Sequence, residues 1–202
     1  RWPRLALVQF LDGDTELQPG FWTAAVDELQ RRPDVAAVCG RRRERAPHAS
    51  LMNRLCDLEW DTPVGETAAF GGDVLVRAGD FADVGGYDES LIAGEDPELS
   101  LRLRLRGRRL LRVDAEMTLH DADLTEVRQW WRRNVRAGHA YAEGAARHGA
   151  RHGHWVRETR SNWVWGAALP LVGGALAAPT IGVSLVAAAA GYGVLYWRAR
   201  RA

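Results

Sequence analysis

Two carboxylates stand one residue apart near the start of the chain, at Asp12 and Asp14, directly after an apolar run at residues 5–11. The run predicts a short buried strand, so both side chains would lie at a strand end. Gly13 between them lets the backbone bend so that the carboxylates can converge. Carboxylate oxygens are the ligands that hard divalent cations such as Mg²⁺ prefer. Asp-Gly is also common turn chemistry, and for this motif in isolation a turn is the better interpretation.

A second acidic group lies at Glu95 and Asp96, and His120 follows a predicted short strand. Asp96-Pro97 is typical of a helix start, with Asp96 at the N-cap and Pro97 as the first helical residue. Taken alone, Asp96 is a capping residue and His120 a structural one. Together with the first carboxylate pair they would form one metal-assisted transfer site, with a carboxylate as base and the histidine as a further ligand.

The elements that must position these residues alternate between helix and strand. We expect helices at 21–32, 51–60, 97–106 and 123–146, a helical turn at 79–84, a basic loop at 41–50, and strands at 35–39, 74–76, 110–113 and 117–119. Residues 99–106 alternate leucine with arginine or serine, which by period indicates a strand, but the helix start and Gly107 favour a helix. Continuous apolar strands between helices predict an α/β fold.

Residues 161–197 contain no charged side chain, and aromatic residues stand at both ends with arginines beyond them. This pattern is typical of membrane-spanning structure. Pro179 divides the stretch, so we expect a transmembrane hairpin of helices at 163–178 and 180–197, with one long kinked span as the alternative. The helix at 123–146 combines tryptophan with arginine, which predicts a membrane-interface position. A buried hairpin and a basic surface helix of a soluble protein are the competing interpretations.

Overall charge and cysteine content narrow the function further. The formal net charge is only +1, which does not favour a nucleic-acid partner. Cys39 and Cys56 lack metal-ligand spacing, so we expect buried free thiols.

The order of the motifs resembles that of the family 2 glycosyltransferases, which have the GT-A fold. The resemblance covers roughly residues 5–140. Its matching segments are Leu-Asp-Gly-Asp-Thr at 11–15, Gly71-Gly72 with Arg77, Val-Gly-Gly-Tyr-Asp-Glu at 84–89, Gly-Glu-Asp-x-Glu-Leu-x-x-Arg-Leu-x-x-x-Gly at 94–107, and His120. The Gly-Glu-Asp block is the most specific of these, because several spaced positions match at once.

The resemblance implies an inverting transfer of a sugar from a nucleotide-sugar donor to a hydroxyl of a lipid-linked or cell-envelope glycan acceptor. Asp96 would be the general base, supported by Glu95. A divalent cation, Mg²⁺ or Mn²⁺, would be bound by Asp14, Asp12 and His120. The groups that the resemblance places at the diphosphate and sugar are Asp12, Asp14, Gly71, Gly72 and Asp73.

The resemblance also implies a domain order in which the N-terminal half of the GT-A domain, which selects the nucleotide base, is missing from this sequence. Residues 1–122 would be the C-terminal portion of the catalytic domain, 123–160 an amphipathic membrane-interface helix and linker, and 161–198 the transmembrane segment. The protein would then sit in the inner cell membrane with its catalytic domain on the cytoplasmic side. The stretch from Gln129 lacks the final tryptophan of the Gln-x-x-Arg-Trp motif of processive synthases, which favours transfer of a single sugar.

Two other functions remain open from the sequence. One is a non-catalytic membrane scaffold with a GT-A shape, and an intact Asp96 speaks against it. The other is a metal-dependent nucleotidyltransferase, whose phosphate-binding loop would lie upstream of this sequence.

Overall fold

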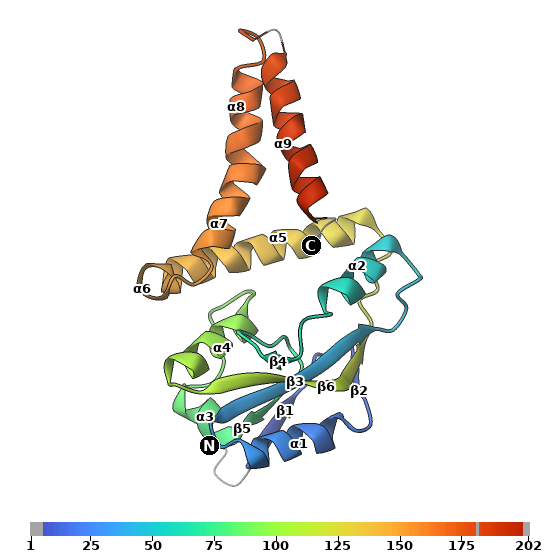
Figure 1. Cartoon of the computed structure of the whole chain (residues 1–202), viewed down its shortest axis with the longest axis vertical. Helices are drawn as coiled ribbons and strands as arrows, with labels where there is room; N and C mark the ends of the chain where they lie inside the picture. The colour runs from blue at the N-terminus through green and yellow to red at the C-terminus, as the bar shows by residue number, and fades with distance from the viewer. Residues whose placement is uncertain (1–5, 181, 200–202) are drawn as a thin grey trace. The chain divides into compact units, whose positions relative to one another are not determined.

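The computed structural model describes residues 6–180 and 182–199 (Figure 1). They divide into two compact units, residues 1–137 and 138–202, and each unit is described here by itself. The candidate chemical groups all belong to the first unit. The three-part division at residues 122 and 160 stays a prediction.

A mixed sheet forms the centre of the first unit. Its strands are β1 (Leu7–Phe10), β2 (Thr15–Leu17), β3 (Val35–Glu44), β4 (Gly65–Glu66), β5 (Val74–Arg77) and β6 (Arg109–His120). The strand order is β1-β5-β3-β6-β2, and β4 pairs with β6. Only the β3–β6 pair is parallel among these described pairs. The C-terminal ends of β1, β3 and β6 therefore meet the N-terminal ends of β2 and β5 at one edge of the sheet, and the predicted site residues cluster at that edge.

Helices cover both faces of this sheet. They are α1 (Phe21–Arg31), α2 (Leu51–Glu59), α3 (Ala78–Asp83) and α4 (Glu95–Leu105), and the start of α5 (Val127–Gly144) also belongs to this unit. Four successive residues of β3, 35–38, are at most 1% exposed, as expected for a strand that is covered on both sides. Helix α1 contributes Phe21, Ala25 and Leu29 to the core at helical spacing. The predicted α/β class is confirmed, and so are buried free thiols at both cysteines.

Two stretches outside the predicted strands belong to strands in the structure. Strand β3 continues into the predicted basic loop as far as Glu44, because its arginines pair with acidic partners and its backbone pairs with β6. The predicted strands at 110–113 and 117–119 are one continuous strand, β6, whose irregular register against β3 accommodates the polar residues between them. The helix predicted at 97–106 is confirmed as α4.

The second unit is helical. Its elements are the end of α5, the π-helical segments η1 (Ala145–Gly149) and η2 (Val164–Ala168), and α6 (Ala150–His152), α7 (Val156–Trp163), α8 (Leu169–Ala175) and α9 (Val183–Ala199). Helices α8 and α9 lie side by side, and the Ser184 hydroxyl donates a hydrogen bond of 2.8 Å to the Gly173 carbonyl.

The transmembrane hairpin predicted at 163–178 and 180–197 is wrong. Among the helices that the structure describes, none has both the length and the apolar character needed to cross a membrane. The chain between α8 and α9 takes residues out of the apolar stretch, which leaves 17 residues in α9, whereas a span takes about 20. The inner-membrane location predicted from this hairpin is contradicted by the same finding.

Candidate metal-assisted transfer site

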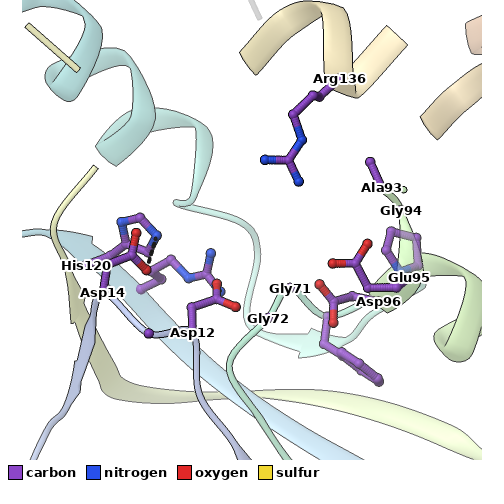
Figure 2. Close-up of a pocket in the computed structure, with 14 residues that line it drawn as sticks. Asp12, Asp14, Gly71, Gly72, Ala93, Gly94, Glu95, Asp96, His120 and Arg136 are labelled. Atoms are coloured by element: carbon purple, nitrogen blue, oxygen red, sulfur yellow. Dashed lines mark ion pairs between the residues drawn. The ribbon is translucent and has the colours of Figure 1, made fainter. Parts of the chain in front are cut away.

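The site is an open cavity of about 710 Å³ at the sheet edge where the five strand ends meet (Figure 2). It is lined by residues from four of the predicted motifs, those at 11–15, 71–72, 94–107 and 120, whereas the motif at 84–89 contributes none. Its lining includes Asp12, Asp14, Arg42, Gly71, Gly72, Glu95, Asp96, His120 and Arg136. Carboxylates dominate this list, and a cavity with this lining favours cations and groups that arrive bound to them.

Asp12, Asp14 and His120 form a group that could hold a metal ion. One ligand atom of each residue lies within 4.8 Å of the others. The pairing of β2 with β6 produces this proximity, because Thr15 lies opposite His120 and the Asp121 amide donates to the Asp14 carbonyl at 3.0 Å. Nε2 of His120 is 3.4 Å from Oδ1 of Asp14. Two carboxylate oxygens and one imidazole nitrogen facing a cavity suit a divalent cation that keeps further positions for water or phosphate oxygens.

The surroundings of His120 favour the neutral imidazole that a metal ligand must be. Burial and the nearby Arg42 guanidinium lower its pKa, against the opposing effect of the carboxylates of Asp14 and Asp12. The Trp60 indole lies 4.7 Å away, measured between ring centroids. Burial also raises the pKa of Asp12, although Arg42 acts in the opposite direction.

Asp73 holds the carboxylate loop in place from behind the cavity. Its side chain is fully buried and accepts hydrogen bonds from the Asp12 amide at 2.9 Å and from the hydroxyls of Thr15 and Thr118 at 3.0 and 2.6 Å. Nε of Arg42 lies 3.1 Å from Oδ2 of Asp73, the oxygen that also accepts from Thr118. The resemblance had placed Asp73 at the donor, but in the structure this residue is not part of the cavity lining.

Gly72 is required by the close approach of Asp12. A Cβ atom at position 72 would lie 2.1 Å from Oδ1 of Asp12, far inside van der Waals contact. The neighbouring Gly71 similarly faces Arg42, whose Nη2 would be 3.2 Å from a Cβ atom. The glycine pair therefore lets the segment before β5 pass directly against the carboxylate and the guanidinium.

Arg42 is a site residue that the sequence interpretation missed. It lines the cavity from β3, its Nη2 is 3.3 Å from Oδ2 of Asp12, and its guanidinium lies over the Trp60 ring at 5.6 Å. Its side chain is 15% exposed. This arginine is fixed beside the candidate metal ligands and presents its charge to whatever binds there.

Asp96 faces the cavity because it is not the helix cap. Helix α4 begins at Glu95, two residues before the predicted first helical residue Pro97, and its N-cap is Gly94 in the left-handed conformation with φ 87°. The predicted capping role of Asp96 is therefore wrong, and its carboxylate instead accepts a hydrogen bond from the Tyr87 hydroxyl at 3.1 Å. Burial, reinforced by the neighbouring Glu95, raises the pKa of Asp96 to about 7. A carboxylate with this pKa can exchange a proton near neutral pH.

Glu98 and Arg102, from the same motif, stabilise the position of helix α4. Arg102 grips the Glu98 carboxylate with three hydrogen bonds and donates to the Val84 carbonyl at 2.6 Å. These contacts anchor α4 to the turn that follows α3. The helix that supplies Glu95 and Asp96 is thereby fixed relative to Tyr87.

Arg136 lines the cavity from α5, within the first unit (Figure 2). It was predicted only as one arginine of an interface helix. Glu95 and Asp96 lie together on one side of the cavity. Gly71 and Gly72 lie between them and the group formed by Asp12, Asp14 and His120 (Figure 2).

The fold and the cavity together describe an α/β protein with a candidate metal-assisted transfer site. No profile of a known protein family matches the chain. Two curated proteins, both named pre-mycofactocin glycosyltransferase and both from Mycobacterium tuberculosis (strains CDC 1551 / Oshkosh and ATCC 25618 / H37Rv), are 36% identical to it over 75 residues. The matched segment is 37% of this chain and 16% of the length of each relative.

Proposed function

We propose that this chain is part of a glycosyltransferase that moves a sugar from a nucleotide-sugar donor to a hydroxyl of a glycan acceptor. The observation that carries the proposal is one cavity that holds both a potential cation-binding group, Asp12, Asp14 and His120, and a carboxylate, Asp96, with a pKa near 7. The similarity to the mycobacterial glycosyltransferases supports glycosyl transfer in general. The order of the motifs supports the narrower assignment to family 2.

The carboxylate–histidine group would bind the donor at its diphosphate. Asp12, Asp14 and His120 would hold Mg²⁺ or Mn²⁺, and when bound this cation neutralises the charge that develops on the departing diphosphate. Arg42, fixed by Asp73 and Trp60, would face the same oxygens with donors in a rigid plane. Asp73 would act through the position of Asp12 and Arg42.

Asp96 would take the proton from the attacking hydroxyl. With a pKa of about 7 it is substantially ionised at neutral pH, yet basic enough to accept a proton as the new bond forms. The Tyr87 hydroxyl would hold the carboxylate in place. The base and the leaving-group side stand at opposite ends of the cavity, an arrangement that suits attack on the face opposite to the departing group, and hence inversion.

The acceptor remains broadly defined. A lipid-linked acceptor was expected because the interface helix at 123–146 would hold the site near a membrane, and the loss of the transmembrane hairpin removes the anchor from that argument. A hydroxyl of a cell-envelope glycan is the acceptor class that we retain. A scaffold without activity is disfavoured, because a buried carboxylate with a raised pKa weakens the fold at neutral pH and a scaffold has no use for it.

The test is to separate donor binding from transfer. We expect Mn²⁺ to promote binding of nucleoside diphosphates and their sugars to the wild-type chain, measured by calorimetry. Asp14→Ala should abolish this binding. Asp96→Asn should keep it and lose transfer, which is followed as release of the nucleoside diphosphate in the presence of glycan acceptors.

Asp114→Asn is a suitable control, because this exposed residue on β6 is not among the cavity-lining residues. Retention of transfer in Asp96→Asn, or no cation-dependent binding by the wild-type chain, would contradict the proposal.

A further inference from the structure

A second cavity, of about 290 Å³, adjoins the first within the same unit. The two cavities share Arg42, Phe70 and Gly71 as a common wall. Nothing in the proposed donor binding or proton transfer uses this second space. Its size lies at the lower end of small-molecule sites, about 300–1,000 Å³, and fits a single ring with a substituent.

The unusual feature of this cavity is Arg112 on β6, which lines it and is only 4% exposed. In the part of the chain that the structure describes, its guanidinium meets two oxygen atoms. Nε donates to the Gly40 carbonyl at 3.4 Å, and Nη2 lies 3.6 Å from Oδ1 of Asp61. Asp61 is itself 66% exposed and lies 3.4 Å from Arg41 as well. This buried cation therefore has only a distant, shared and solvated counter-ion.

Two other enclosed arginines of the unit, Arg42 and Arg102, are paired more closely. Nε of Arg42 is 3.1 Å from the fully buried Asp73, and Nη2 of Arg102 is 2.6 Å from Glu98. Burying a charge without a close partner is costly. Such a residue facing a cavity is an expected place for an anionic group of a ligand to bind.

The remaining walls indicate what carries that anionic group. Trp60, Phe70 and Met117 supply apolar surface, and an indole ring is a suitable face for a sugar ring. Glu59 also lines the cavity and would repel a doubly charged phosphate. A planar group with one negative charge, a carboxylate, matches the guanidinium fork best.

We propose that the second cavity is a subsite for a uronic acid, whose carboxylate binds Arg112 and whose ring packs against Trp60. The proposal deepens the proposed glycosyl transfer and rests on it for the role of the sugar, since the residues that the two cavities share place the subsite beside the proposed transfer site. The sugar acid belongs either to the donor or to the acceptor. Both sources share the chemistry that Arg112 recognises.

The binding step can be tested without any transfer. The chain contains two methionines, and Met117 lines the cavity whereas Met52, on α2, does not. With ¹³C-methyl methionine in the full chain, titration with D-glucuronate should shift the Met117 signal and leave Met52 in place. D-Glucose should bind at least tenfold more weakly. A shift of neither signal, equal affinity for glucose, or tighter binding of glucose 6-phosphate would overturn the proposal.

Arg112→Met keeps the apolar stem and removes the charge, and the Asp61 carboxylate that loses its partner is 66% exposed to solvent. We expect it to weaken glucuronate binding at least tenfold, with Arg112→Lys intermediate. The matched control is Arg109→Met, three residues earlier on β6, where the arginine is 41% exposed and pairs with Glu66. Unchanged glucuronate binding in a folded Arg112→Met chain would overturn the proposal, and the wild-type titration decides it if that variant does not fold.

Kinetics then distinguish the two sources. If the uronic acid is the transferred sugar, Arg112→Met raises KM for a nucleoside diphosphate glucuronate. If it belongs to the acceptor, KM rises instead for a glucuronate-bearing glycan. A wild-type chain that binds glucuronate but transfers nothing would contradict glycosyl transfer and leave the uronate subsite standing.

Discussion

The hydroxyl of Tyr87 donates a hydrogen bond of 3.1 Å to Oδ1 of Asp96. Tyr87 is held for this contact by its ring, which packs edge-on against Phe10 and Phe81. The hydrogen bond stabilises the ionised carboxylate and so opposes the effects of burial and of Glu95, which favour its protonated form. Asp12 and Arg42 act on the same carboxylate with opposite signs. Tyr87 is therefore a positioning residue that also limits how far the pKa of Asp96 rises.

Replacing Tyr87 by phenylalanine should raise the pKa of Asp96 further. The ring contacts remain, but the ionised carboxylate loses a hydrogen-bond donor, which corresponds to about one pH unit. The acidic limb of the pH–rate profile should move upward by that amount, and ¹³C NMR titration of the aspartate carboxyl groups should show the same shift. Tyr141→Phe, in the second unit, is the control. If the acidic limb of the profile does not move, Tyr87 does not influence the pKa of Asp96.

Asp96→Asn should stabilise the fold at alkaline pH. The pKa of Asp96 is raised from 3.8 to about 7, so the folded chain keeps a proton that the unfolded chain releases between these values. The free energy of unfolding therefore falls as the pH rises through this window. Asparagine cannot ionise, so the variant avoids this decrease in the free energy of unfolding. The decrease amounts to about 1.4 kcal/mol for each unit by which the pKa is raised.

Urea unfolding at pH 4 and pH 8 checks this prediction. The variant and the wild-type chain should be similar at pH 4, and the variant should be the more stable at pH 8. Asp114→Asn should follow the wild-type chain at both values. A variant less stable than the wild-type chain at pH 8 would mean that the carboxylate is not buried as described.

Gly72→Ala should weaken cation binding while the fold persists. The added Cβ would lie 2.1 Å from Oδ1 of Asp12, and because the Asp12 side chain is 41% exposed it can swing into the cavity. We expect Mn²⁺ affinity to fall about tenfold or more, as for other changes that misplace a ligand. Gly79→Ala on α3 is the matched control, since a Cβ there meets nothing within 4 Å. Calorimetric titration with Mn²⁺ measures both, and equal affinities would argue against Asp12 as a ligand.

Asp73→Asn should destabilise the first unit strongly. The fully buried carboxylate accepts hydrogen bonds from three donors and neutralises Arg42, and an amide can do neither completely. Breaking a buried ion pair from one side costs about 3–5 kcal/mol. The control is Asp34→Asn, where the exposed pair with Arg109 should contribute little to stability. The free energies of unfolding in denaturant compare the two variants. A similarly small loss in both would mean that Asp73 does not hold the carboxylate loop and Arg42 in place.

Local sequence patterns predicted most helices and the core strands of the first unit, because apolar spacing carries that information. The same patterns were wrong at the end of β3, where consecutive charged residues predict a loop. The strand continues because Arg42 and Glu44 find partners that local sequence does not reveal: Asp12 and Asp73 for Arg42, and Asn53 for Glu44. The site residue Arg42 was missed for the same reason.

The carboxylates of the site were identified from the sequence, but their geometry was not. Asp96 and Gly94 are both acceptable helix caps, and only the left-handed backbone of Gly94 releases the aspartate to the cavity. In the second unit, the absence of charge from 161 to 197 indicated spans. Pro179 indicated a break in this stretch, but local sequence did not show that turns at 176–180 and 182 shorten the apolar helices on either side.

The four groups that meet Asp73 come from separate parts of the chain: the Asp12 amide after β1, the Thr15 hydroxyl on β2, the Arg42 guanidinium on β3 and the Thr118 hydroxyl on β6. The two carboxylates after β1 therefore have no fixed arrangement until those strands have paired. Molecules with an unassembled sheet should bind divalent cations no better than scattered acidic residues do. Cation affinity would then act as a reporter of folding, and the cation would in turn shift the folding equilibrium toward the complete sheet.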